Sequence, residues 1–513
     1  MNTPGAATTI AHHAIHIATI APLPVAPDID AALVEKNEAA TATANTNATT
    51  VIASKPRIGL ANSIPIYVNG IVSGEIITMP GVVWHFVRSP GMCLVLWMLG
   101  GLGCYCGAFS YAELAAMLPR NGGELVYLRH CYKRPRQLFS YLYTMGQYLL
   151  AAATLQRGHP IEEVTTPANA WTVRGIGAGL LGCMVLLNLM GARWVATIHS
   201  GLAVVKLISL AIFILAGFTM LAKGVDLPSP HNWSNLFANS STNPGDYVLA
   251  FLMVNWSITG WRMMCYSVEE VQRPARTLPL GMGTAITLNN LLILLVNVEY
   301  ITLMPSDVVY RSRQLVGSEF SGMLFGPSFG QTTLSILIAF TSFGAVSVCF
   351  YATNCIAHAA ARQGYLPASA FFRAVSPRTG APVRVIALNT ALVLVMLFAP
   401  PPGDTYILLS SMTAFQIWTF FSLVAAGLLW LRWREPSRER PFRVWLPLTI
   451  AFLAIGLFLC VGTFIFQTEH YVFGTTPYYV AELLGISVML MGVPVWYVMV
   501  ARKQQQQQQQ TTE

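Results

Sequence analysis

The sequence predicts an all-α membrane protein with about twelve transmembrane helices, and three observations predict this class. The 513-residue chain is 54% hydrophobic and only 10% charged, whereas soluble domains are about 25% charged. Its mean hydropathy is +0.54. Most of the chain consists of apolar runs of about 20 residues separated by short polar loops, the length that crosses a bilayer as a helix. Helices also satisfy every backbone polar group away from water.

The chain divides by composition into three parts. Residues 1–54 are rich in Ala, Thr, Asn and Pro, which predicts a disordered cytosolic tail. A transmembrane domain follows over 55–503, and a polyglutamine tail occupies 504–513. The third span is the shortest, at the lower limit for a crossing helix. The predicted spans, in chain order, are 58–86, 91–118, 138–155, 173–191, 194–222, 246–268, 280–303, 331–359, 381–400, 404–432, 444–467 and 477–500.

The basic residues predict the orientation of the spans. The net charge of +8 does not predict nucleic-acid binding, because the charges lie in short loops. Loops on the side of the two termini carry 21 Lys and Arg residues, and the opposite loops carry six. This bias places both termini in the cytosol, in a multi-pass protein that we expect in the plasma membrane. Two sequons, at Asn232 and Asn239, fall in a loop predicted to lie outside.

The sequence offers no sign of a metal, a cofactor or catalysis. Eight of the nine Cys residues lie within or at the edge of apolar spans, which favours free, packed thiols over a disulfide framework. No nucleophile–base arrangement, metal-ligand cluster or phosphate-binding loop is found in the spans. We therefore expect no cofactor, no metal and no enzymatic activity.

Two apolar spans are interrupted by glycine at corresponding positions. Span one contains Gly70 and Gly74, and span six contains Gly260. Broken helices in two halves of a chain are typical of transporters, because the freed peptide groups replace the water that a substrate gives up. The spacing predicts a five-plus-five inverted repeat over about 58–222 and 246–432, with two extra helices over 444–500. Glycine that merely permits close helix packing remains an alternative reading.

Four further blocks of sequence resemble a known family. The chain resembles the amino acid–polyamine–organocation superfamily and, within it, the L-type amino acid transporter family, with the strongest resemblance to fungal high-affinity methionine permeases. The resemblance extends over about residues 56–500. The blocks that carry it are Ser110-Tyr-Ala-Glu-Leu through Pro119-Arg-Asn-Gly-Gly-Glu, Gly260-Trp followed by Glu269-Glu-Val-Gln-Arg-Pro, Ala361-Arg-Gln-Gly-Tyr-Leu-Pro, and Glu439-Arg-Pro-Phe-Arg-Val.

The resemblance implies a leucine-transporter-type fold with substrate held between the breaks of spans one and six. The substrate carboxylate would meet N–H groups around Ser73 and Gly74. Its amino group would meet carbonyls around Trp256 to Thr259, with Trp256 as an aromatic gate. The substrate-binding residues so implied are Ile71, Val72, Ser73, Gly74, Glu75, Trp256, Ser257, Ile258, Thr259 and Gly260.

Two charged residues in the spans are candidates for a proton or cation site. Glu75 stands where the family usually has a third glycine, so a carboxylate would lie beside the carboxylate site; we predict a role in proton coupling or in selecting amines. A solvated residue in the vestibule is the alternative. Lys206, in the middle of span five, should face the interior and have a partner. The resemblance places it where sodium-coupled relatives bind a cation, with Ser342 and Ser347 as expected neighbours.

Three other charged residues lie in the spans or at their ends. Glu113 ends span two, and we expect it to cap or pair there. Arg262 follows the break of span six, and we suggest Glu75 as its partner. Glu299, near the outer end of span seven, replaces what is usually a small residue in the family; we expect it to be exposed at the interface and assign it no role.

The predicted function is secondary active transport: proton-coupled import of methionine or another neutral amino acid. An amine, choline or polyamine carrier is the alternative that Glu75 favours. A non-transporting nutrient sensor is the alternative that the altered break and the short third span favour. The expected partners are the amino acid substrate, protons and the lipid bilayer. The sequence does not identify a partner subunit, the substrate side chain or the oligomeric state.

Overall fold

The computed structural model describes residues 58–132, 138–143, 167–223, 232–398, 405–466 and 480–501. The chain divides into two units, Met1–Ser54 and Lys55–Glu513. The first unit and the predicted polyglutamine tail both fall beyond the described ranges. Within those ranges the regular structure is helical, apart from an isolated parallel bridge between Ile58 and Val271. The predicted all-α class is confirmed.

The first predicted span is two helices, α2 (Leu60–Ile71) and α3 (Glu75–Val87). The sixth span is also made of two segments, α9 (Pro244–Ser257) and the 3₁₀ helix η1 (Thr259–Glu270). The other helices, in chain order, are α4 (Pro90–Met117), α5 (Glu124–Cys131), α7 (Pro167–Leu189), α8 (Ala192–Ala222), α10 (Pro274–Leu303), α11 (Ser306–Ser312), α12 (Val316–Phe325), α13 (Pro327–Arg362), α14 (Ser369–Phe372), α15 (Val383–Phe398), α16 (Thr405–Arg434), α17 (Leu446–Ile465), α18 (Val480–Leu490) and α19 (Gly492–Trp496), with short segments η2 (Arg313–Leu315) and η3 (Tyr497–Ala501).

The membrane-spanning helices agree with the spans predicted from sequence. Among the described residues, eight helices are long and apolar enough to cross a membrane, and α2 with α3 forms one further bent span. Two shorter apolar helices, over Arg174–Leu189 and Val383–Phe398, match predicted spans four and nine. Residues 138–143 of the third predicted span are helical. The rest of that span, residues 144–155, belongs to the part of the chain that is not described.

Local sequence explains where several helices begin. Proline occupies the first turn of α4, α9, α10 and α13, where its missing N–H costs no helical hydrogen bond. Asn243 caps α9, because its side chain accepts a hydrogen bond from the Gly245 N–H at 2.9 Å. These four helices begin one to six residues before the predicted starts.

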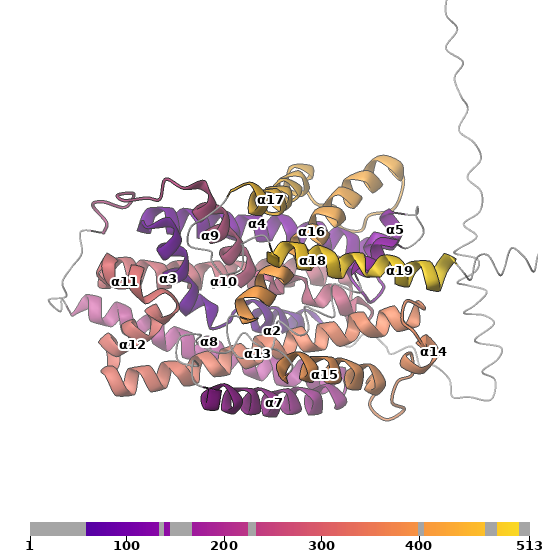
Figure 1. Ribbon diagram of the computed structural model, residues 1–513, viewed down its shortest axis with the longest axis horizontal. Coiled ribbons are helices and arrows are strands. Elements are labelled where there is room, and N and C mark those ends of the chain that lie inside the picture. The colour runs from indigo at the N-terminus through magenta and orange to yellow at the C-terminus, as the bar shows by residue number, and fades with distance from the viewer. Residues whose placement is uncertain are drawn as a thin grey trace, which may run out of the picture. The chain divides into compact units, whose positions relative to one another are not determined.

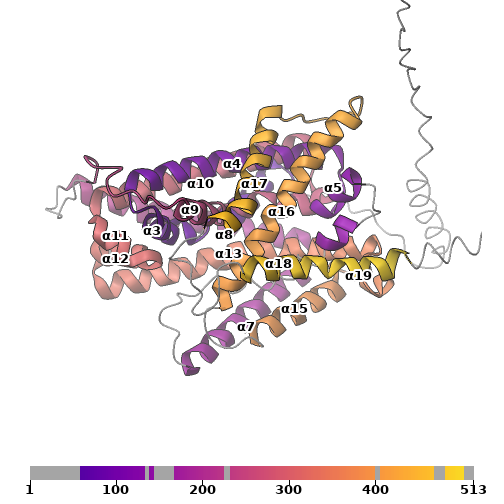
Figure 2. The same ribbon diagram turned by 45° about the horizontal axis from the view of Figure 1, so that its top comes forward.

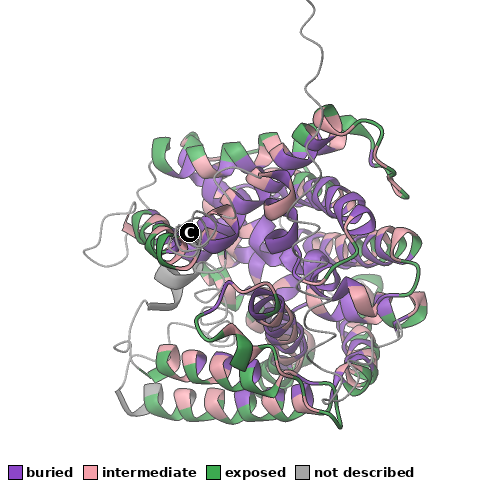
Figure 3. Ribbon diagram, turned by 90° about the vertical axis from the view of Figure 1, so that its right-hand side faces the viewer, coloured by how far each residue is buried: buried purple, intermediate pink, exposed green. Residues whose placement is uncertain are grey.

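The helices pack around α2 and the α9–η1 segment. Helix α10 packs against both α2 and α4, and α13 packs against α2 and η1. Helices α7 and α15 lie side by side, apart from the centre (Figures 1 and 2). Buried residues gather toward the middle, while the outer faces of the helices are exposed (Figure 3). Large apolar side chains on those faces, such as Leu186 and Ile336, each 66% exposed, suit contact with lipid.

An aromatic cluster joins four helices next to the middle of the fold. Tyr111 of α4 packs edge-on against Trp261 of η1, with ring centroids 5.0 Å apart. Phe421 of α16 and Phe452 of α17 contact the same pair. Such edge-to-face pairs each contribute about 0.5–1.5 kcal/mol beyond their buried area. The cluster thus fixes η1 against the helices that surround it.

Candidate functional site

The first span is broken at its centre, as predicted. Helix α2 ends at Ile71 because Val72 adopts an extended conformation, with φ −74° and ψ 109°. Helix α3 begins at Glu75, and the two axes are bent by 40°. The Val72 N–H still donates to the Val68 carbonyl at 2.8 Å. The next two N–H groups, of Ser73 and Gly74, have no backbone acceptor among the described residues, so the break leaves polar peptide groups available at the start of α3.

Lys206 binds the carbonyl groups that the break leaves free. Its ammonium donates to the Asn69 carbonyl at 3.0 Å and to the Val72 carbonyl at 2.6 Å. The residue is 0% exposed. Carbonyls at the carboxyl end of a helix carry partial negative charge, which favours a cation there. Lys206 therefore ties α8 to the end of α2, and the prediction that it faces the interior with a partner is confirmed.

The hydrogen-bond acceptors of Lys206 are backbone carbonyls, and not the two serines expected to lie near it. Within the described ranges, its ammonium bonds to backbone carbonyls of span one, and neither Ser342 nor Ser347 donates to or accepts from it. The Ser347 hydroxyl is buried without a hydrogen-bond partner. Ser342 lies instead beside the start of α3, since a Cβ placed on Gly74 would be 3.3 Å from its Oγ. The break of span one itself supplies the acceptors of the Lys206 ammonium.

A second polar contact next to Lys206 was not predicted. The Asn69 side-chain amide donates to Nδ1 of His199 at 2.7 Å and to the Gly344 carbonyl at 3.2 Å. His199 is 1% exposed. It precedes Lys206 by seven residues, about two helical turns, so both residues lie on the face of α8 that covers span one. This spacing is the signal by which the sequence could have indicated it.

Span six is interrupted, but only Ile258 separates its two segments. Helix α9 ends at Ser257, Ile258 has φ −111° and ψ 16°, and the chain continues as a 3₁₀ helix from Thr259. Within this segment Ser267 has non-helical angles, φ −125° and ψ 37°, so the 3₁₀ stretch is itself interrupted by a kink. The Ile258 N–H donates to the Asn255 carbonyl at 3.3 Å, and the Thr259 hydroxyl donates to the Trp256 carbonyl at 3.1 Å. The expected break is thus a change of helix type, and some carbonyls expected to be free already accept one hydrogen bond.

The two interrupted spans touch through glycine. A Cβ placed on Gly260 would lie 2.1 Å from the Gly70 carbonyl oxygen, a distance that no side chain tolerates. Glycine at this position lets η1 approach the backbone of α2 directly. Trp256, 3% exposed, is buried one turn before this contact. The segments predicted to form the binding site are therefore adjacent.

Glu75 occupies the first position of α3, directly at the break. Its Oε2 accepts a hydrogen bond from the Ser73 hydroxyl at 3.3 Å. A carboxylate in the first turn of a helix is stabilised by the helix dipole. The suggested pairing with Arg262 is wrong, because the Arg262 guanidinium lies over the Phe421 ring, 4.9 Å from its centroid. A cation over an aromatic face is favourable, so the Phe421 ring stabilises this guanidinium without a contact to Glu75.

The surroundings of Arg262 include a buried carboxylate that was not predicted. Glu124 is 1% exposed and accepts hydrogen bonds from three tyrosine hydroxyls. The distances are 3.1 Å to Tyr111, 2.8 Å to Tyr143 and 3.0 Å to Tyr266. These bonds satisfy the carboxylate away from water. They connect α4, α5, residues 138–143 and η1.

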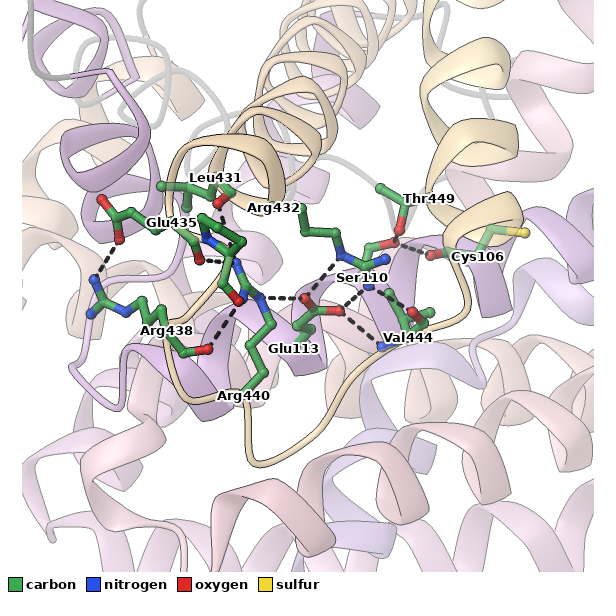
Figure 4. A network of polar contacts seen from close by, with 11 residues as sticks. Cys106, Ser110, Glu113, Leu431, Arg432, Glu435, Arg438, Arg440, Val444 and Thr449 are labelled. Atoms are coloured by element: carbon green, nitrogen blue, oxygen red, sulfur yellow. Dashed lines mark hydrogen bonds and ion pairs between the residues drawn. The ribbon is translucent and has the colours of Figure 1, made fainter. Parts of the chain in front are cut away.

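Glu113 is buried in a network of polar contacts that joins α4 to the loop between α16 and α17 (Figure 4). Its carboxylate pairs bidentately with the Arg432 guanidinium, lies 3.3 Å from Nε of Arg440 and accepts the Val444 N–H at 2.8 Å. Glu113 is 0% exposed. The expectation that it caps or pairs at the end of span two is confirmed.

A second carboxylate follows in the same loop. Partial burial would raise the pKa of Glu435, but hydrogen bonds from Arg434, Arg438 and His130 lower it to about 2. The side chain therefore stays ionised at neutral pH. It holds basic groups of α16, of the following loop and of α5 close together.

Glu299 lies in a different place from the one expected. The side chain is 2% exposed, so the expectation of an exposed residue at the interface is wrong. The physical reason is Gly217 on α8, where a Cβ would lie 2.5 Å from Oε1 of Glu299. The missing side chain leaves space that the carboxyl group fills.

These features define a class of protein. A helix broken in the membrane beside a second interrupted helix, with a buried ammonium on the freed carbonyls, is the arrangement of a secondary transporter. The chain belongs to the amino acid permease family, whose model matches residues 58–491. It is therefore a secondary amino acid transporter, as the sequence predicted.

Similar proteins agree with this family. The high-affinity methionine permease of Saccharomyces cerevisiae is 24% identical over 470 residues, which cover 89% of this chain and 81% of that protein. The Asc-type amino acid transporter 1 of Mus musculus is 26% identical over 454 residues, covering 87% and 81%. The b(0,+)-type amino acid transporter 1 of Mus musculus is 27% identical over 415 residues, covering 80% and 82%. The resemblance drawn from the four sequence blocks is confirmed.

Proposed function

We propose that this transporter imports methionine or another neutral amino acid together with protons. The break of span one carries the proposal, because it combines free N–H groups at Ser73 and Gly74 with an ammonium bound to the opposite helix end. The name of the Saccharomyces cerevisiae relative supports methionine as the first substrate to test. The Asc-type and b(0,+)-type names support the wider class of amino acids.

The substrate carboxylate binds at the start of α3 in this proposal. The N–H groups of Ser73 and Gly74 and the positive end of the helix dipole favour an anion there. The amino group faces the carbonyls at the end of α9, from Trp256 to Thr259. Ile71, Val72, Ser257, Ile258 and Gly260 complete the backbone walls, and the Trp256 ring covers the substrate. Glu75 shares this helix end, and two carboxylates there repel each other, so in this proposal binding of the substrate anion is linked to binding of a proton.

Lys206 takes the place of a transported metal cation in this proposal. Its ammonium already satisfies the Asn69 and Val72 carbonyls, to which a sodium ion would otherwise coordinate. A fixed positive charge at this point removes the need for sodium. Protons then supply the driving force, with Glu75 as one titratable group beside the substrate.

The proposed setting is the plasma membrane, with both termini in the cytosol. The excess of Lys and Arg in the loops on the side of the termini, 21 against six, supports this orientation. It places the Glu113 network on the cytosolic side. Import from the medium then proceeds from the opposite side, where α11 and α12 lie.

Competition of labelled methionine uptake tests the proposal. The chain is expressed in cells that lack their own permeases, and uptake is measured at two pH values with neutral, acidic and basic amino acids and with choline and polyamines as competitors. We expect competition by neutral amino acids, faster uptake at the lower pH and no dependence on sodium. If only the amines compete, the substrate is an amine and not an amino acid. Uptake that equals the empty-vector background for every compound would favour a sensor.

A further inference from the structure

Glu299 on α10 is a buried carboxyl group with no hydrogen-bond or ion-pair partner in the described parts of the chain. Neither of its side-chain oxygens has a partner, and the residue is 2% exposed. Glu113 and Glu124 are equally buried, but each accepts several hydrogen bonds. An unpaired carboxylate in a dry environment is strongly unfavourable, so the neutral acid is the form that this position favours.

A notch in the neighbouring helix accommodates this acid. A Cβ on Gly217 of α8 would lie 2.5 Å from Oε1 and 2.6 Å from Cδ of Glu299. We call this space the Gly217 notch. Any residue larger than glycine would push the carboxyl group out of it. The notch and the acid belong to different helices, so the fit exists only while α8 and α10 are packed together at this point.

The Gly217 notch lies on the same face of α8 as Lys206. Eleven residues separate Gly217 from Lys206, which is close to three full helical turns and about 16 Å along the axis. His199 lies on this face as well, toward the other end of α8, and its Nδ1 contacts Asn69. The same face of α8 therefore contacts the break of span one near the middle of the helix and the carboxyl group of Glu299 near Ala222.

We propose that Glu299 is a proton-binding residue of this transporter, which holds its proton while its carboxyl group fills the Gly217 notch. The proposal rests on the proton-coupled transport proposed above and adds a second proton site to it. Separation of α8 from α10 admits water to the carboxyl group. A hydrated carboxylic acid ionises at neutral pH, so opening of this contact releases the proton and closing of it requires one. Proton binding and helix packing are thereby linked.

Several titratable groups on the helices packed against α10 have partners of their own, and the unpartnered Tyr67 hydroxyl of α2 belongs to a ring that lies at Gly281, toward the other end of α10. His85 on α3 contacts the Tyr310 carbonyl at 3.0 Å, Cys93 on α4 donates to Asn297 at 3.4 Å, and Lys206 on α8 is bound to span one. Tyr300, next in the chain, donates to the Ile77 carbonyl at 2.9 Å. No Lys, Arg or His in the described ranges lies within ion-pair distance of Glu299. We therefore expect the access of water, and not the approach of a counter-ion, to determine whether the Glu299 carboxyl group is ionised.

The deciding experiment compares wild-type protein with Glu299→Gln in proteoliposomes, with labelled methionine as the probe. Three quantities are measured: exchange of methionine without a pH gradient, accumulation driven by a pH gradient, and methionine-dependent proton movement reported by a trapped pH dye. Gln imitates the neutral acid, so we expect exchange to persist. Gradient-driven accumulation and proton movement should be lost. Glu319→Gln, which neutralises an exposed carboxylate on α12, is the matched control and should behave as wild type.

A second variant keeps the acid and fills the notch. Gly217→Ala forces the carboxyl group out of its dry position, so we expect the pH profile of methionine uptake to move to lower pH. Wild-type coupling in Glu299→Gln, or an unshifted profile in correctly folded Gly217→Ala, would overturn the proposal. Wild-type protein that exchanges methionine but never moves protons would instead contradict the proton coupling of the proposed function. The two failures are therefore distinguishable.

Discussion

At the scale of single residues, Lys206 is the group on which the broken span depends most. Replacing it by Met removes two charge-assisted hydrogen bonds to the Asn69 and Val72 carbonyls, each worth roughly 1.5–3 kcal/mol. We expect methionine uptake to fall about tenfold or more. Lys223→Met, at the exposed end of the same helix, is the control and should leave uptake unchanged. Restoration of uptake in Lys206→Met by sodium would support the view that the ammonium substitutes for an ion; sodium dependence of the wild type would contradict it.

Glu75 stands where the resemblance implied a third glycine at the break of span one. Because its carboxylate stands at the first position of α3 beside Ser73, it shares a helix end with the proposed substrate carboxylate. Glu75→Gln removes that repulsion, so we expect tighter methionine binding at neutral pH and a flatter pH dependence of uptake. A pH series of uptake rates measures both effects. Identical rates and an identical pH profile in the variant would reduce Glu75 to a solvated side chain.

At the scale of the elements, the contact between α2 and η1 sets the geometry of the site. Gly260→Ala would bring a Cβ to 2.1 Å from the Gly70 carbonyl oxygen, so the two segments must separate. We expect uptake to be lost while protein still reaches the membrane, as measured by surface labelling. Gly201→Ala on α8 is the matched control, because nothing lies within 4 Å of its Cβ position. Full activity of Gly260→Ala would show that the approach of these two segments is not needed.

The Glu113 network holds α4 to the loop between α16 and α17. Glu113→Gln leaves the guanidinium groups of Arg432 and Arg440 without their buried carboxylate. Breaking a buried ion pair from one side costs about 3–5 kcal/mol, so we expect a clearly lower Tm in detergent. Glu439→Gln, an exposed residue of the same loop, serves as control. Equal melting temperatures for both variants would contradict a stabilising role for the network.

At the scale of the whole molecule, the sequence predicted more of the fold than of the contacts within it. Hydropathy depends on nearby sequence, so most helix bounds are predicted to within a few residues, although α7 and α10 begin six residues before the predicted starts at 173 and 280. The glycines of spans one and six likewise marked where the helices change. The partners of Lys206 and the burial of Glu299 depend on which helices become neighbours. Gly217, which makes room for Glu299, is far away in the sequence, and no local pattern relates the two.

The orientation of the whole chain in the membrane can be tested by labelling single cysteine substitutions. The loop that precedes α9 should lie outside the cell, and the loop between α16 and α17 in the cytosol. Asn239 and Ser437 are exposed in these two loops. We therefore expect a membrane-impermeant thiol reagent to label Asn239→Cys in intact cells and Ser437→Cys only after the membrane is permeabilised, above the background of the native cysteines.

The same loop contains a control for burial. The Asn232 side chain is 6% exposed, and its amide donates to the Ile301 and Met304 carbonyls at 2.9 and 3.0 Å. Asn232→Cys should resist labelling on either side, because the packed loop shields it. These contacts also make Asn232 a poor sequon in the folded chain, which leaves Asn239 as the accessible one. Labelling of Ser437→Cys in intact cells would invert the topology, and the Glu113 network would then face the medium from which substrate is taken.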